Sequence, residues 1–481
     1  MTTIKLDPGA ALLLDALHGA GHAAYAVGGC VRDSLLGLPP HDWDLCTSAR
    51  PEQVMALFGE EKCIPTGLQH GTVTVKQGGR LYETTTFRTE GAYSDGRHPD
   101  AVCFVPDVRE DLARRDFTIN AMAYSAEEGL IDPFGGRDDL AAHLVRAVGE
   151  PERRFEEDAL RILRLYRFAA RFGFAIDPAT GAAARALGPH LDCVSAERIQ
   201  EELLKLLAAP RPGSYLEPAV LAVILPELEP EKQPERFAEL CRTIDRIEPT
   251  AENVPARLAA LLCPLGETGA RKALRKLKCS NALTDEVTAL VGGSVGSFLL
   301  GHEFELRHPA DALCLERHSH PAGRCPNSNS LFPPQAAVVT VAGHSIARPI
   351  ACGNRVPPQR TVLGETPGTP NTTLTVQAKR LLGRYELPTI QRLTALCSAR
   401  HPEQAEAFAA LRAEAEQLTA ENACCRVSQL AVNGRDLMAA GVRPGPGLRQ
   451  VLNALLEAVI TGQTPNEKDA LLAAAARFSA S

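Results

Sequence analysis

Two short motifs near the start of the chain combine residue types at the spacings that nucleotide chemistry requires. The first is the glycine pair Gly28-Gly29, with Arg32 three residues later, between an apolar run and a helix-like stretch. Such a pair lets backbone N–H groups at a helix start approach a polyphosphate. The second motif is Asp42-x-Asp44. On an extended segment both carboxylates lie on one side, because side chains alternate, and two oxygen ligands on one face suit Mg²⁺.

Each motif alone has an ordinary explanation, since Gly-Gly turns and solvated acidic pairs are both common. Joined across a short strand-helix-strand unit, the motifs predict two-metal nucleotidyl transfer. Asp42 and Asp44 are therefore candidate catalytic residues and metal ligands. Glu83 lies on a later β-prone segment, where it faces this pair, forms an ion pair with Arg88 or is simply solvated.

The segments that position these motifs have the pattern of an α/β unit over the first 140 residues. Residues 72–75 and 81–87 are β-prone, and glycines separate them. A helix is predicted over 52–58, because Ser48 and Pro51 form a typical helix start. Residues 89–99 are polar and contain glycine, which predicts a mobile loop beside the site.

A second group of charged residues follows at Arg114-Arg115-Asp116. Adjacent arginines neutralise phosphates where a metal alone leaves residual charge, and Asp116 is able to accept a hydrogen bond from a ribose hydroxyl. A surface ion pair among the three is the alternative. The sequence Asp-Pro-Phe-Gly-Gly at 132–136 is typical of a turn before a helix and would suit a hinge between domains.

A predicted helix that begins near Glu156 carries a row of arginines. Arg161, Arg164, Arg167 and Arg171 recur at spacings of three and four, so they share one broad face. Between Asp158 and Asp177 the sequence has no acidic residue to pair with them. Because solvated helices usually interleave acids and bases, phosphates are the predicted partners.

Asp158 and Arg161 lie near each other on this predicted helix and offer one acceptor and one donor fork. Cytosine and adenine both present an amino donor beside a ring-nitrogen acceptor, whereas guanine and uracil present a carbonyl beside an N–H group. One rigid Asp/Arg pair would therefore admit CTP and ATP and reject GTP and UTP.

Composition excludes several classes of protein. The chain has 481 residues, a net charge of -7 and 14 cysteines without a C-x-x-C pair. An acidic balance argues against indiscriminate nucleic-acid binding, and scattered cysteines predict neither a zinc knuckle nor a disulfide scaffold. The sequence has no signal-peptide pattern and no apolar run long enough for a bilayer, so we expect a cytoplasmic protein without a membrane partner.

Taken together, the motifs resemble those of bacterial class II tRNA nucleotidyltransferases, the CCA-adding enzymes of the poly(A) polymerase family. The resemblance is specific over residues 20–210 and weaker beyond. It is carried, in the order found in that family, by Gly28-Gly29-x-Val31-Arg32-Asp33, Asp42-x-Asp44, Arg114-Arg115-Asp116-Phe117-Thr118-Ile119-Asn120, Asp132-Pro133-Phe134-Gly135-Gly136, Glu157-Asp158-x-x-Arg161-x-x-Arg164 and Glu197-Arg198-Ile199.

The resemblance implies template-independent addition of CCA to the 3′ end of tRNA from CTP and ATP. Asp42 and Asp44 would hold Mg²⁺, and Asp158 and Arg161 would be the protein template for the incoming base. The helix opened by residues 195–198 would brace that template. Other residues would contact the nucleotide, some implied by the resemblance and some by the local patterns above. They are Gly28, Gly29, Arg32, Arg115, Asp116, Arg164 and Arg167.

The implied fold is α+β, a nucleotidyltransferase β-sheet head followed by an all-α neck, body and tail. The predicted limits are a catalytic head at 1–140, a neck with the base template at 141–208, a body at 209–302 and a tRNA-binding tail at 377–481. Residues 303–376 do not fit, because they are rich in Pro, His and Ser and lack helical periodicity. A disordered insertion and a reading-frame error in the source sequence are both open explanations.

Two other functions stay open. One is a relative that adds only A, either to tRNA that already ends in CC or as a poly(A) polymerase, although the strongly basic C-terminal extension that favours polyadenylation is absent. The other is a non-catalytic RNA-binding relative, which the intact Asp42, Asp44 and Arg115 argue against. The loop at 89–99 argues against a CC-only enzyme, since such relatives typically carry a shorter loop. The sequence identifies no protein partner.

Overall fold

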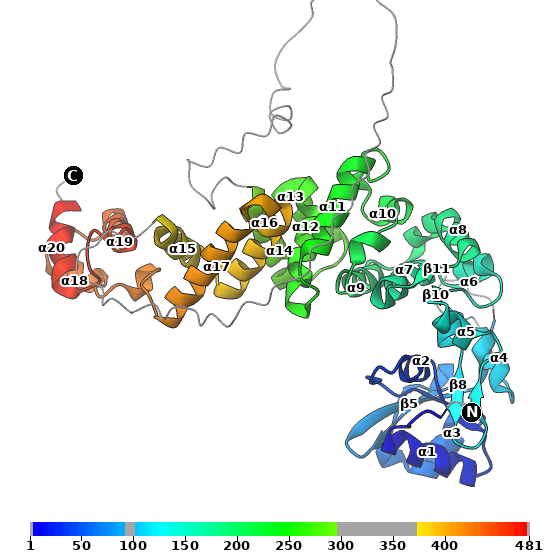
Figure 1. Ribbon diagram of the computed structural model, residues 1–481. Helices are drawn as coiled ribbons and strands as arrows, with labels where there is room; N and C mark the ends of the chain where they lie inside the picture. The colour runs from blue at the N-terminus through cyan, green and yellow to red at the C-terminus, as the bar shows by residue number, and fades with distance from the viewer. Residues whose placement is uncertain (1–2, 92–101, 296–372, 479–481) are drawn as a thin grey trace, which may run out of the picture.

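The computed structural model describes residues 3–91, 102–295 and 373–478. Within these ranges the molecule is elongated, with a sheet-containing head at the N-terminal end and helices along the rest of its length (Figure 1). The predicted α+β class, with a β-sheet head followed by helical segments, is confirmed. The limits predicted for neck, body and tail remain predictions.

The head is built on a seven-stranded sheet, in the order β3-β4-β5-β2-β1-β8-β9. Its neighbouring strands are antiparallel except for β2 and β5, which run parallel with Leu45 opposite Thr84. The strands are β1 (Ala24–Val27), β2 (Leu45–Thr47), β3 (Cys63–Gly67), β4 (Thr72–Gln77), β5 (Arg80–Thr86), β8 (Ala123–Ser125) and β9 (Gly129–Ile131). The strands predicted at 72–75 and 81–87 are therefore confirmed as β4 and β5.

Short helices surround this sheet. They are α1 (Pro8–Gly19), α2 (Gly29–Leu35), α3 (Pro51–Phe58), α4 (Val108–Ala113) and α5 (Gly136–Ala141). The helix predicted over 52–58 is confirmed as α3, which begins at a proline as expected.

Two small sheets lie outside the main one. Strands β6 (Arg88–Glu90) and β7 (Val102–Phe104) pair antiparallel, so the start of the loop predicted at 89–99 is a strand. Most of that loop lies outside the described residues. Strands β10 (Leu144–Val145) and β11 (Ala175–Ile176) pair in parallel where the head gives way to the helices.

Helices joined by loops and short 3-10 turns make up the rest of the described chain. They are α6 (Pro151–Glu157), α7 (Leu160–Phe172), α8 (Pro178–Ala186), α9 (Ala196–Leu207), α10 (Pro218–Ile224), α11 (Pro234–Arg246), α12 (Val254–Leu262), α13 (Gly266–Lys276), α14 (Asn281–Val295), α15 (Thr373–Arg384), α16 (Leu387–Arg400), α17 (Ala405–Ala420), α18 (Gly434–Ala439), α19 (Pro446–Ile460) and α20 (Lys468–Phe478). Among these described residues no helix is long and apolar enough to cross a membrane.

The helix predicted to begin near Glu156 is in fact two helices, and that prediction was wrong. Helix α6 ends at Glu157, Asp158 is extended with φ −147° and ψ 103°, and α7 begins at Leu160. The Oδ1 atom of Asp158 accepts a hydrogen bond from the N–H of Leu160 at 3.1 Å. The aspartate therefore satisfies a free N–H at the start of α7 instead of lying on the same helix as Arg161.

The segments on either side of residues 296–372 pack together. Helix α16 lies beside α12 and α14 near the middle of the molecule (Figure 1). Arg400 donates to the carbonyl of Ser294 at 2.7 Å, and Arg392 forms an ion pair with Glu286. Residues 296–372 themselves, which include most of the atypical segment predicted at 303–376, lie outside the described residues.

Candidate active site

The two candidate metal ligands lie immediately before β2. Trp43 is buried, at 7% exposure, while Asp42 and Asp44 on either side of it are exposed. The predicted alternation is therefore confirmed, although the residues precede the strand instead of forming part of it. The N–H of Val27 donates to the carbonyl of Asp44 at 3.0 Å, which holds the acidic pair beside the glycine turn that follows β1.

Negative charge accumulates at this point. The pKa of Asp44 is raised to about 6, first by partial shielding from water and then by the negative charge of Glu83 on β5. Arg115 lowers this pKa, and Asp42 raises it slightly further. Among the described residues no cluster of three or more His, Cys, Asp or Glu side chains is arranged to hold a metal. Two exposed carboxylates that repel each other, with a third acid nearby, nevertheless fit a hard divalent cation, because the cation would relieve the repulsion.

Arg115 lies over the glycine turn. Gly28 has a φ of 77°, which favours glycine, and a Cβ atom there would lie 2.8 Å from Nη1 of Arg115. Arg115 has only a long contact with Asp111, at 3.5 Å, and its buried Nε has no hydrogen-bond partner among the described residues. Of the arginines predicted to bind nucleotide, Arg115 therefore retains clear donor capacity for a phosphate.

Arg32 is buried and occupied by protein contacts. Its Nε donates to Asp33 at 2.8 Å and its Nη1 donates to Asn120. Its guanidinium lies over the rings of Phe168 and Phe172 at 5.2 and 4.8 Å from their centroids. A Cβ atom on neighbouring Gly29 would lie 3.6 Å from its Nη2. In this arrangement Arg32 joins α2 to α7.

The arginines of α7 share one face, as predicted, but carboxylates from other elements occupy them. Nη2 of Arg164 donates to Asp116 at 2.6 Å, and Nε of Arg167 lies 2.6 Å from Glu202. Arg171 reaches Asp33 at 3.1 Å. The phosphates expected from the lack of local acids are thus not needed to satisfy these side chains. Local spacing failed to reveal the partners because they lie on α2, α9 and the segment after α4.

Asp158 and Arg161, the predicted template pair, also have protein partners. Arg198 on α9 donates to Oδ2 of Asp158 at 2.8 Å. Arg161 is 8% exposed and donates to Glu157 at 2.8 Å and to the carbonyl of Arg114 at 3.1 Å. Arg198 and Glu157 belonged to quoted motifs, whereas Glu202 was missed because no local sequence signal identifies it.

Models of three known protein domains match most of the described chain. Residues 24–146 match the poly A polymerase head domain, residues 173–232 match the probable RNA and SrmB-binding site of polymerase A, and residues 382–475 match tRNA nucleotidyltransferase domain 2. A CCA-adding enzyme of Lactobacillus helveticus (strain DPC 4571) is 33% identical over 466 residues, which are 95% of this chain and 94% of that protein. The chain belongs to the family of CCA-adding enzymes.

Other relatives agree with this assignment. A CCA-adding enzyme of Leuconostoc citreum (strain KM20) is 45% identical over 257 residues, but the match spans only 53% of this chain and 63% of that protein. The crystal structure of the Bacillus stearothermophilus CCA-adding enzyme in complex with CTP has a TM-score of 0.69 and 30% identity, with 98% of each chain covered. The chain is therefore a nucleotidyltransferase that adds CCA without a nucleic-acid template, and enzymes of this family are metal-dependent.

Proposed function

We propose that this chain adds C, C and A in turn to the 3′ end of tRNA in the cytoplasm, with CTP and ATP bound between the sheet of the head and the arginine face of α7. Asp42 and Asp44 are the proposed ligands of Mg²⁺. The bound metal would activate the terminal 3′-hydroxyl and stabilise the departing pyrophosphate. The reaction joins that hydroxyl oxygen to the α-phosphorus and releases pyrophosphate from the same phosphorus.

The observation that carries the proposal is the meeting of the acidic pair and the glycine turn. The backbone hydrogen bond from the N–H of Val27 to the carbonyl of Asp44 joins the acidic segment to the residue before Gly28, over which Arg115 lies. Metal ligands, a turn that a phosphate is able to approach closely and an arginine with spare donors therefore occur together. Nucleotidyl transfer requires this combination, because a triphosphate must be neutralised and oriented at once.

Base selection is assigned to Asp158 and Arg161. The carboxylate of Asp158 would accept from the amino group of cytosine or adenine, and the guanidinium of Arg161 would donate to the adjacent ring nitrogen. Both groups are held in place by protein contacts, Asp158 by Arg198 and Arg161 by Glu157. For Arg161 to contact a base, its hydrogen bond to Glu157 must be replaced by one to the base. The proposal therefore includes a movement of α7 relative to Glu157.

A stepwise extension experiment tests this function. Purified protein is offered tRNA that ends at the discriminator base, at C or at CC, with each nucleotide separately and Mg²⁺ present. We expect CTP to extend the first two substrates and ATP to extend only the third. Extension of the CC substrate alone would identify an A-adding enzyme, and repeated addition of A would identify a poly(A) polymerase. No addition at all would leave the non-catalytic alternative.

A further inference from the structure

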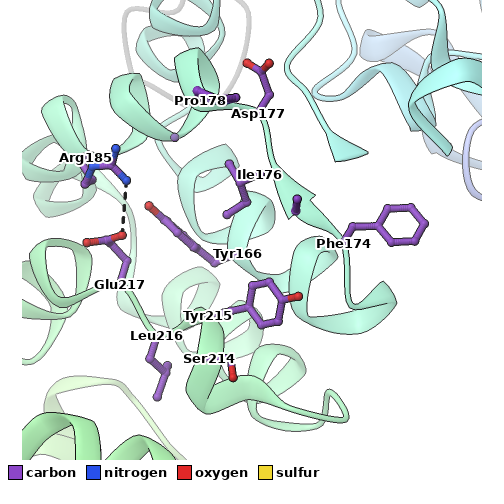
Figure 2. Close-up of a pocket in the computed structure, with 12 residues that line it drawn as sticks. Tyr166, Phe174, Ile176, Asp177, Pro178, Arg185, Ser214, Tyr215, Leu216 and Glu217 are labelled. Carbon is purple, nitrogen blue, oxygen red and sulfur yellow. Dashed lines mark ion pairs between the residues drawn. The ribbon is translucent and has the colours of Figure 1, made fainter. Parts of the chain in front are cut away.

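A cavity of about 640 Å³ lies on the side of α7 away from the arginine face. Tyr166 lies among its walls, together with residues of β11, α8 and the turn at Pro212–Tyr215 (Figure 2). At about 100° per residue, Tyr166 is roughly opposite the mean direction of the four arginines. The volume is within the range of sites that bind small organic ligands. None of the residues assigned to the nucleotide site lines this cavity.

Tyr166 brings a buried polar atom to this cavity. The residue is 4% exposed, and its hydroxyl interacts with the carboxylate of Glu217 but makes no hydrogen bond of normal geometry within the described residues. Figure 2 shows the hydroxyl end of the ring directed toward Arg185 and Glu217. A buried hydroxyl whose hydrogen bond is poorly formed is unfavourable, so a ligand that offered it a better-aligned partner would gain affinity.

Arg185 and Glu217 are a loosely joined pair at the same end of the cavity. Nη1 of Arg185 lies 3.7 Å from the carboxylate of Glu217, whereas charge-assisted hydrogen bonds are about 2.7–2.9 Å long. Arg185 is half exposed and Glu217 is 22% exposed. Each group therefore keeps hydrogen-bonding capacity for a ligand edge, one as a donor fork and the other as an acceptor.

The rest of the lining suits a flat apolar body. Ile176 and Tyr215 lie beyond Tyr166 as seen from Arg185 and Glu217 in Figure 2, whereas the ring of Phe174 is directed away from them. Aromatic rings are the surfaces on which nucleobases stack. All lining residues except Tyr166 belong to the segment 173–232, whose family match concerns probable RNA binding but identifies neither a base nor a cavity.

We propose that this cavity is a second base-binding site, which takes an unpaired base with an amino group beside a ring-nitrogen acceptor, as in cytosine or adenine. Glu217 accepts from the amino group, Arg185 donates to the ring nitrogen, and the hydroxyl of Tyr166 gains a better-aligned hydrogen bond. Uracil and guanine are disfavoured, because each would direct a carbonyl oxygen toward the carboxylate of Glu217. The base comes either from a free nucleotide or from an RNA strand.

Nucleoside binding to the full chain tests the proposal. Cytidine, adenosine, uridine and guanosine are titrated by calorimetry against the Asp158→Ala variant, which removes the carboxylate acceptor of the proposed template pair from the active site. We expect cytidine and adenosine to bind at least about tenfold more tightly than uridine and guanosine. Glu217→Gln in the same background should weaken cytidine binding at least about tenfold. The matched control, Glu227→Gln, changes the same charge at an exposed position outside the cavity and should have no effect.

A second variant separates ligand binding from folding. Tyr166→Phe removes a buried hydroxyl that has no well-formed hydrogen bond, and little else, so the melting temperature without ligand should stay close to that of the wild type or rise. The increase in melting temperature that cytidine produces should become smaller, because that increase depends on affinity. A lower melting temperature without ligand, together with an unchanged response to cytidine, would show a structural role for the hydroxyl and overturn the proposal.

A competition experiment identifies the source of the base. If tRNA that lacks its CCA end displaces bound cytidine, the site serves RNA; if it does not, the site serves free nucleotides, and both results support base binding. The proposal is overturned if no nucleoside binds, if uridine binds as tightly as cytidine, or if Glu217→Gln leaves cytidine binding unchanged. This test does not depend on catalysis, so it stands or falls separately from the proposed function.

Discussion

The guanidinium of Arg164 on α7 donates two hydrogen bonds to Oδ2 of Asp116, from Nε at 2.9 Å and from Nη2 at 2.6 Å, and so joins the helical part of the molecule to the head. Asp116 is 8% exposed, and its other oxygen accepts from Asn120 at 3.0 Å and from the N–H of Phe117 at 2.8 Å. Burial acts to raise the pKa of Asp116, but Arg164 and these hydrogen bonds outweigh it and lower the pKa well below its usual range. The pair therefore stabilises the junction in its ionised form.

We expect Asp116→Asn to lower the free energy of unfolding by about 2–3 kcal/mol at pH 7. The expected loss of stability is smaller than the loss on breaking a fully buried ion pair, because about a third of the Arg164 side chain is exposed. A lowered pKa in the folded state means that the contribution is present above the unfolded pKa of about 3.9 and is lost as the pH falls below it. Urea unfolding of both proteins from pH 7 to pH 2 measures the difference. An exposed control, Asp138→Asn, should change little, and a difference that grew as the pH fell would contradict the assignment.

Asp44→Ala should reduce CCA addition by more than about 10²-fold, which is the scale for loss of one preorganised electrostatic contact. Affinity for tRNA, measured by filter binding, should stay within a few-fold of wild type, because the carboxylate is proposed to act on chemistry. Asp42→Ala should behave in the same way. Asp15→Ala changes an exposed aspartate on α1 and serves as the control. Normal rates in either active-site variant would exclude the proposed metal ligands.

Asp158→Ala should relax the choice of base as well as slow addition. One base-edge contact is worth about 1–3 kcal/mol of discrimination, so incorporation of U relative to C should rise roughly 5- to 150-fold. Arg198→Ala should produce a smaller change in the same direction, since Arg198 holds the carboxylate of Asp158. Incorporation ratios on tRNA that ends at the discriminator base provide the measurement. Unchanged rejection of UTP by Asp158→Ala would place the template elsewhere.

Arg257 is fully buried, forms no salt bridge with the carboxylates of the described residues, and donates to the carbonyls of Leu207, Ala209 and Ile247 at 2.5–3.1 Å. Arg257→Met should lower the free energy of unfolding by roughly 3 kcal/mol or more, because several buried carbonyls lose their donor. Arg236→Met, at an exposed position, should have an effect within about 0.5 kcal/mol. Chemical denaturation of the two variants makes the comparison. Equal stabilities would mean that water replaces the guanidinium.

Features that depend on neighbours in the sequence could be predicted from the sequence itself. Asp42 and Asp44 are exposed on either side of buried Trp43, because side chains alternate along an extended backbone. The arginines of α7 share a face for the corresponding reason in a helix, and the order of the motifs along the chain is enough to indicate the family. The split between α6 and α7 was missed, because Asp158 leaves the helix and accepts a hydrogen bond from the N–H of Leu160, and periodicity alone does not reveal a break of two residues.

Only the tertiary structure decided what the charged residues contact. Arg164 meets Asp116 across 48 positions and Arg171 meets Asp33 across 138, distances over which no periodic pattern extends. Arg32 was predicted to contact nucleotide, yet the packing of α7 on the head buries it over Phe168 and Phe172. Desolvated charges require partners, and the fold supplied them to Arg164 and Arg171 from distant parts of the sequence, whereas Arg32 and Arg161 also pair with the near neighbours Asp33 and Glu157.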